Sequence, residues 1–190
     1  VLGAQERSEK LEYELYLQVR EAVLEHLRAI QTAAAALAQL DLEALPALGF
    51  NNTYALAVTS PTARRYNLRT ISDLQALSDL RFGLSHEFRD RADGWPGLKS
   101  IYGLPQDSSG IEHGLAYQAL LEDEIDVTDA YSTDGDLQRY QLVVLEDDRG
   151  YFPSYHALPL TRQDLDSEVK AILGELADRL DDESMRALNA

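Results

Sequence analysis

The chain has 190 residues, 45% of them hydrophobic, and its 33 acidic residues against 17 basic ones give a formal net charge of −16. A chain of this length and composition can bury a core in one domain or in two small ones, and its acidity argues against nucleic acid as a partner because no basic stripe could neutralise a phosphate backbone. The sequence has no cysteine, which rules out disulfides, thiolate catalysis and cysteine-ligated metal.

Two stretches with helical spacing of apolar residues frame the chain. From Ser8 to about Leu40, apolar side chains recur every three, four or seven residues, which predicts an amphipathic helix. The pattern returns from Asp164 to about Leu180, with Asp164 or Ser167 as the candidate N-cap. Both helices are expected to serve as scaffold.

Between these helices, short apolar runs alternate with helical patterns. The runs YALAV, LRFGLS, IDVTDAY and LVVLEDD read as strands, and the order of elements predicts βαβ units around a partly parallel sheet, an α/β fold. Ser109 and Glu112 fit a capping box that would begin a helix. Residues 86–110 hold so much glycine and proline that we expect a long irregular loop serving a site.

The motifs of common catalytic sites are missing. The sequence has no G-x-S-x-G, no Walker A loop and no H-E-x-x-H, and its four histidines are scattered rather than spaced as metal ligands. Ser85, His86 and Glu87 are consecutive, so on an extended chain they point to opposite faces and cannot form a triad with one another. We therefore expect no enzyme activity, no cofactor and no metal.

Tyrosines gather where the predicted strands end. Tyr54 lies in the stretch GFNNTYALAV, Tyr131 closes the run IDVTDAY, and Tyr151 and Tyr155 lie in GYFPSY. Each tyrosine taken alone reads as an ordinary half-buried core residue. Together, beside polar turns, they favour a site in which aromatic faces hold a cation, each contact contributing ~0.5–2 kcal/mol.

These segments resemble one family. GFNNTYALAV, TISDL, GLSHEFRDRADGWPGL with IYGL, EHGLAYQAL, IDVTDAYSTDG, LVVLEDDRGYFPSY and the terminal ESMRALN are similar, in order and separation, to the glycine betaine/carnitine/choline-binding proteins of ABC importers. The resemblance runs from about residue 45 to the end. It implies a periplasmic-binding-protein fold of type II, with two α/β lobes that close on a trimethylammonium solute.

The resemblance also implies site residues. Tyr54, Tyr131 and Tyr155 match positions that form walls of the family's aromatic cage. Asn52 stands where relatives have an aspartate or asparagine whose oxygen faces the methylated cation. Arg91 matches an arginine that grips the ligand carboxylate, a role suited to the guanidinium fork.

The sequence departs from the family at its beginning, where the first half of lobe one has no counterpart. We therefore expect residues 1–48 to form a helical part of lobe one, residues 49–148 a complete lobe two, and residues 149–190 the return segment and C-terminal helix of lobe one. The expected partners are a quaternary ammonium ligand and an ABC permease subunit, at an extracytoplasmic location (periplasm or outer face of the cell membrane).

Two expectations follow from the incomplete lobe one. The apolar stripes of the two long helices have lost partners, which favours a homodimer. The rival interpretation of function is a regulatory or protein-interaction domain that kept the lobe-two fold but no longer binds solute.

Overall fold

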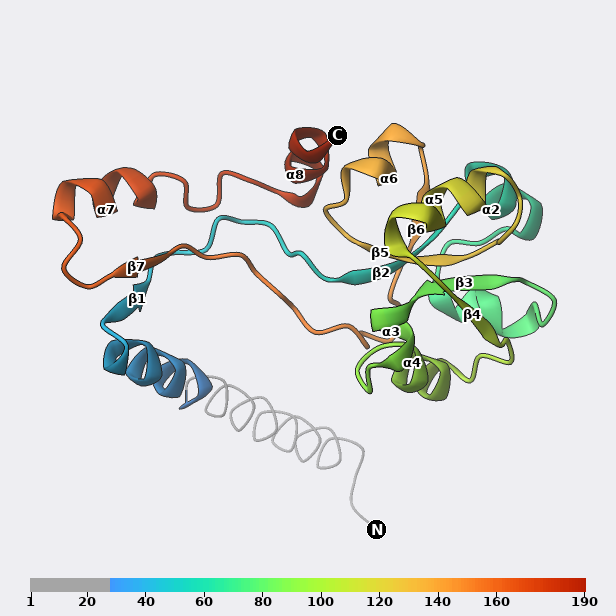
Figure 1. The fold of residues 1–190 in the computed structure, drawn as a ribbon, viewed down its shortest axis with the longest axis horizontal. Helices are drawn as coiled ribbons and strands as arrows, with labels where there is room; N and C mark the ends of the chain where they lie inside the picture. Colours follow the sequence, from blue (N-terminus) through green and yellow to red (C-terminus); the bar gives the residue numbers. More distant parts are fainter. Residues whose placement is uncertain (1–27) are drawn as a thin grey trace, which may run out of the picture. The chain divides into compact units, whose positions relative to one another are not determined.

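The structure is a computed structural model that describes residues 28–190, so most of the predicted first helix, with the stripe from Leu11 to Leu27, lies outside the described residues. The chain divides into two compact units (Figure 1). One contains the described residues up to Pro46 together with Leu158–Gly174, and the other contains Ala47–Ala157 and Glu175–Ala190. The lobe boundaries expected from the sequence stay a prediction.

The smaller unit has a two-stranded antiparallel sheet. Strand β1 (Leu42–Ala44) follows a helix that includes residues 28–39, and it pairs with β7 (Leu160–Arg162). Helix α7 (Ser167–Gly174) is tied to β1 by an ion pair between Lys170 and Glu43. No side chain of α7 or of residues 28–39 is buried. Apolar groups such as Ile30 and Ile172 are therefore exposed in the part of the chain that the structure describes.

The helix expected from Asp164 to about Leu180 is much shorter than predicted. It starts later because Asp166 accepts the backbone N–H of Glu168 at 2.7 Å, whereas Asp164 is paired with Arg162. It ends at Gly174, and the chain then turns through Asp178 with a left-handed φ of 53°. The prediction was too long because the apolar periodicity of the sequence continues to about Leu180, although the backbone turns at Asp178.

The larger unit contains the remaining elements. The strands are β2 (Tyr54–Val58), β3 (Phe82–Ser85), β4 (Ser108–Ile111), β5 (Thr128–Tyr131) and β6 (Val143–Leu145). The helices are α2 (Ser60–Tyr66), the 3₁₀ helix η1 (Ile71–Ala76), α3 (His86–Asp90), α4 (Trp95–Tyr102), α5 (His113–Leu121), α6 (Gly135–Arg139) and α8 (Asp182–Asn189). Among residues 28–190 no helix has both the length and the apolar character to span a membrane.

The strands of this unit combine antiparallel and parallel pairing. Strand β2 lies between β5 and β6 and is antiparallel to both, while β3 and β4 pair in parallel. A parallel bridge between Phe82 and Val127 connects β3 to the start of β5. The expectation of a partly parallel α/β arrangement therefore holds, but the central pairs run antiparallel.

Strand β2 is buried on both faces. Tyr54, Leu56 and Val58 point into a large apolar cluster with residues of β3, α3 and α4, while Ala57 packs with Tyr117 in a smaller one. Alternate residues of a strand face opposite sides. Helices and loops cover both sides, which explains why every residue of YALAV after its tyrosine is apolar, large on one face and small on the other.

The structure corrects the prediction of an irregular loop over residues 86–110. Helix α3 begins there because the Ser85 hydroxyl accepts the N–H of Phe88 at 3.2 Å, and α4 begins with a proline in its first turn and ends at Gly103, whose φ is 61°. Ser109 lies in β4 instead of capping a helix, and Glu112 is the N-cap of α5. Gly94, Pro96 and Gly103 thus mark the ends of α4, where such residues are common.

Helix α8 packs beside α6 in the larger unit (Figure 1). Arg186 and Asn189 donate to the carbonyls of Ser132 and Thr133 at 2.7 and 2.9 Å. The approach is so close that a Cβ on Gly135 would lie 2.3 Å from the backbone of Asn189. A glycine is required at the start of α6 for α8 to dock.

We predict that Gly135→Ala lowers the free energy of unfolding by roughly 1–3 kcal/mol, since the added methyl group must push the α8 backbone away. Gly114→Ala is the matched control because a Cβ there meets nothing within 4 Å. That helix substitution should raise stability by ~0.4–1 kcal/mol. Urea unfolding of both variants tests the pair, and equal stability of the two would contradict the packing described here.

Candidate functional site

The carboxyl ends of β3, β4 and β5 meet at one place. The parallel pairing of β3 with β4, and the parallel bridge from β3 to β5, align Ser85, Ile111 and Tyr131 at the same edge. The ends of parallel strands are where open α/β sheets bind ligands. A cavity of about 360 Å³ lies here, lined by Ser85, His86, Glu87, Ile111, Glu112, His113 and Tyr131.

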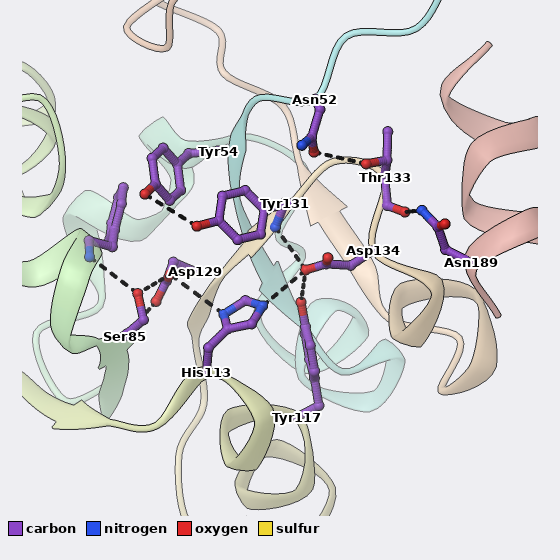
Figure 2. A network of polar contacts seen from close by, with 11 residues as sticks. Asn52, Tyr54, Ser85, His113, Tyr117, Asp129, Tyr131, Thr133, Asp134 and Asn189 are labelled. Atoms are coloured by element: carbon purple, nitrogen blue, oxygen red, sulfur yellow. Dashed lines mark hydrogen bonds and ion pairs between the residues drawn. The ribbon is translucent and has the colours of Figure 1, made fainter. Parts of the chain in front are cut away.

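Tyr54 and Tyr131 form one aromatic pair. The register of β2 and β5 sets them opposite each other, with ring centroids 5.0 Å apart and hydroxyl oxygens separated by 3.5 Å (Figure 2). Phe88 lies 5.0 Å behind Tyr54, and Phe152 lies 6.4 Å from it. Burial raises the pKa of Tyr54, so its hydroxyl is neutral. Tyr131 lines the cavity, and the buried Tyr54 ring supports it from behind.

Arg91 reaches this pair through Glu87. The Glu87 carboxylate accepts from the Tyr54 hydroxyl and from Arg91 Nη1, both at 3.3 Å. Asp93 takes two further bonds from the guanidinium at 2.9 and 2.8 Å and raises the pKa of Arg91. The second N–H on each terminal nitrogen of Arg91 has no partner among the described residues. Arg91 lies outside the cavity lining.

Asn52 and Tyr155 lie together, apart from the aromatic pair. The Asn52 side-chain oxygen accepts the Thr133 hydroxyl at 2.8 Å, and its backbone N–H donates to the carbonyl of Tyr155 at 3.1 Å. The Tyr155 ring is half-exposed, and no ring contact joins it to Tyr54 or Tyr131 within the region that the structure describes. The structure therefore brings together Tyr54, Tyr131 and, through Glu87, Arg91. The remaining two residues form a second group.

The carboxylate of Asp134 organises the turn after Tyr131. It accepts from the Tyr131 backbone N–H at 2.9 Å, from His113 Nε2 at 3.2 Å and from the Tyr117 hydroxyl (Figure 2). Burial alone would raise the pKa of Asp134, but the bonds from His113, Tyr117 and Tyr131 lower it. Asp134 is therefore an anion that fixes the positions of both Tyr131 and His113.

A second, fully buried carboxylate lies on the other side of His113. Asp129 accepts from the Ser85 backbone N–H and from the Ser85 hydroxyl, each at 2.6 Å, and its carboxylate is 4.0 Å from His113 Nδ1. Burial raises the pKa of Asp129, while the two bonds from Ser85 oppose the rise. Ser85 thus begins α3 and stabilises the buried charge at the same time.

Sequence reasoning missed most of the cavity lining. In the sequence, Ser85, His86 and Glu87 stand out only as an apparent triad, and His113 only as one of four scattered histidines. Position could have indicated Ser85, His86 and Glu87, because they lie at the end of the predicted strand LRFGLS. His113 gave no such signal, because the strand before it, β4, falls in a segment predicted as a loop and the start of a helix. Within residues 28–190 no group of three or more His, Asp or Glu side chains could hold a metal ion.

The cavity is suited to a small cation. An aromatic face attracts positive charge through its quadrupole, and a carboxylate attracts it directly. Among the residues that line the cavity, Tyr131 supplies the aromatic face, and Glu87 and Glu112 supply the carboxylates. Nothing in this set pairs a nucleophile with a base that a third group orients, so the arrangement favours binding over covalent chemistry.

Comparison with known proteins gives one family. The family model described as the substrate-binding domain of the ABC-type glycine betaine transport system matches residues 21–190. The glycine-betaine-binding protein of Pseudomonas aeruginosa is 34% identical in an alignment over 157 residues that covers 74% of this chain and 50% of that protein. The ergothioneine transport permease/ergothioneine binding protein of Helicobacter pylori is 35% identical over 147 residues, 75% of this chain and 27% of that protein.

A solved structure is similar to this chain in both fold and sequence. The crystal structure of a glycine betaine/carnitine/choline ABC transporter superposes with a TM-score of 0.72 at 38% identity, covering 78% of this chain and 57% of that one. The expected α/β fold of the type II periplasmic-binding-protein kind is confirmed. The chain spans about half, or less, of the length of the curated relatives that it matches.

Ser85→Ala should destabilise the protein, and more so at higher pH. The change removes a helix cap and a donor to a buried carboxylate, which together should cost roughly 2–4 kcal/mol where Asp129 is ionised. Because the bond from the Ser85 hydroxyl opposes the raised pKa of Asp129, its removal costs less once Asp129 is protonated. The loss of stability should therefore shrink as pH falls towards the ordinary Asp value of about 4.

Urea unfolding across this pH range measures the effect, with the exposed Ser78→Ala as the control. A loss independent of pH would show that the Ser85 hydroxyl acts only as a cap.

Proposed function

Because the chain belongs to the family of substrate-binding domains of ABC-type glycine betaine transport systems, we propose that it binds a quaternary ammonium osmoprotectant such as glycine betaine, choline or carnitine. Membership of this family of binding domains also bears out the expectation that the chain is not an enzyme. Its biological role would be to deliver the solute to an ABC permease subunit.

One observation carries the proposal. The half-buried ring of Tyr131 lines a cavity whose wall also includes Glu87 and Glu112, and it is backed by the ring of Tyr54 at 5.0 Å. A trimethylammonium group cannot donate a hydrogen bond, so aromatic faces and nearby negative charge are the means by which a protein can hold it. The strand ends supply both.

The residues take separate roles in this proposal. Tyr131 provides a wall of the cage, Tyr54 supports that wall, and Tyr155 provides a further wall if its exposed ring turns towards the ligand. Asn52 offers its side-chain oxygen, which already accepts one bond from Thr133. Arg91 binds a ligand carboxylate through the N–H groups that Asp93 and Glu87 leave open.

We infer an extracytoplasmic location, in the periplasm or on the outer face of the cell membrane, because a binding domain of an importer meets its solute before transport. The location follows from the family's role in transport.

We also propose that the chain forms a homodimer. The support is the apolar surface of the smaller unit, where Val169 and Ile172 of α7 are 43% and 60% exposed. Exposed apolar surface tends to be covered by association. Light scattering at about 50 micromolar, well above a micromolar dissociation constant, should give the mass of a dimer, and a monomer at that concentration would refute this part of the proposal.

The same exposed side chains favour a second candidate function, a regulatory or interaction domain that docks a protein. Calorimetry with glycine betaine, choline, carnitine and ergothioneine separates the two. Binding of any of them supports the solute-binding function. If none binds at millimolar concentration, the docking function takes precedence.

We predict that Tyr131→Ala weakens choline binding by ~1–2 kcal/mol, because it removes an aromatic face from a desolvated cation. Tyr140→Ala is the control, since Tyr140 is a partly exposed tyrosine outside the cavity lining. Calorimetry measures both, and a loss of similar size in the control would remove Tyr131 from the site.

Arg91→Ala should weaken glycine betaine binding more than choline binding, by ~1.5–3 kcal/mol, because only glycine betaine offers a carboxylate for a charge-assisted bond. Arg89→Ala is the matched control two positions earlier on the same segment. Equal losses for the two ligands would argue against a carboxylate contact by Arg91. A selective loss in the Arg89 variant would assign the contact to that residue.

A further inference from the structure

His113 lies in direct contact with the tyrosine that lines the cavity. It is the first residue of α5, and its ring centroid is 5.3 Å from that of Tyr131 at an interplanar angle of 57°. Its side chain is one-third exposed and forms part of the cavity wall. A charged imidazole at this distance lies within the range of about 6 Å over which a cation interacts with an aromatic ring.

The surroundings of His113 favour its charged form. A hydrogen bond to Asp134 raises the pKa of His113 against the effect of burial, and the charges of Asp134, Asp129 and Asp136 add to the rise. The other groups that face it are those of the cavity wall and of the adjoining surface. They are His86 and Glu87 of α3, Glu112 and Tyr117 beside it, Tyr131 of β5, Arg139 of α6, and Asn189 and Ala190 at the end of α8.

We propose that His113 is a specificity-determining residue of this site, whose imidazolium beside Tyr131 weakens the binding of a cationic ligand that has no carboxylate more than that of a zwitterionic ligand. The proposal rests on the proposed function, since it concerns the same cavity. It divides the quaternary ammonium ligands by net charge and makes the preference depend on pH.

The antagonism follows from two physical effects. The imidazolium and the ligand cation compete for the ring of Tyr131, and they repel each other across a small cavity. Binding linkage is reciprocal, so a proton that weakens the cation must itself be held less tightly once the cation is bound. Asp134 and Asp129 keep the imidazole at the wall and prevent it from turning away into solvent.

The net charge of the ligand decides the size of the effect. Choline carries a positive charge alone, whereas the carboxylate of a zwitterion is attracted to an imidazolium and offsets the repulsion of its ammonium group. Above the pKa of His113 the imidazole is neutral and the discrimination disappears. The affinity for choline should therefore rise with pH through the pKa of His113, and the affinity for glycine betaine should change less.

Calorimetry of the full chain at about pH 5.5 and about pH 8.5, on either side of the ordinary histidine value, tests this. The dissociation constant of choline should be about fivefold larger at the lower pH, a size expected for two partly screened charges, and that of glycine betaine should change by less than about twofold. His113→Gln keeps a hydrogen-bond donor without the charge, and it should abolish the pH dependence. His156→Gln, an exposed histidine outside the cavity lining, should retain it.

A second measurement does not depend on the variant folding. In the unsubstituted chain, an NMR titration of the His113 ring should give a lower pKa with saturating choline than without it. A pKa unchanged by choline, or the same pH dependence in His113→Gln as in the unsubstituted chain, would overturn the inference and leave the proposed function standing. Loss of the dependence in His86→Gln alone would transfer the role to that residue. Absence of binding by both ligands at both pH values would overturn the inference and the proposed function together.

Discussion

The antiparallel pairing of β2 with β5 is the constraint on which the site depends. Its register sets Tyr54 opposite Tyr131, and because side chains alternate along a strand, a slip of one residue in either strand would turn that strand's tyrosine to the other face. The apolar clusters on the two sides of β2 fix that register. The core therefore positions the aromatic pair, and the cavity lies where β5 ends.

Two carboxylates fix the orientation of the residues around the aromatic pair. Asp134 holds the Tyr131 backbone and the His113 ring, and buried Asp129 joins β5 to the start of α3 through Ser85. Helix α8 adds bonds to the carbonyls of Ser132 and Thr133 from a distant part of the chain. An anionic network thus supports an aromatic wall, as the proposed binding of a cation requires.

The sequence predicted β2, β3, β5 and β6 of the larger unit, because runs such as YALAV and IDVTDAY carry apolar patterns between clear turn signals, but it missed β4. It failed at residues 86–110, where glycine and proline suggested a loop although Gly94, Pro96 and Gly103 mark the ends of α4. It also extended the last apolar stripe through Gly174, since periodicity does not register a backbone turn. Family resemblance selected Tyr54 and Tyr131, which do meet. Glu87 and His113 were missed because their place in the site comes from the alignment of strand ends, which residue type does not reveal.

An NMR titration of the isotopically labelled chain with choline at alkaline pH tests the central claim most directly, that the ligand binds at the ends of β3, β4 and β5. The account predicts that the largest changes in backbone amide signals fall on residues that line this cavity, such as Glu87, His113 and Tyr131. The larger unit has another cavity, lined by residues that include Arg64, Tyr66 and Gln141. Changes centred there, or no changes at millimolar choline, would contradict the account.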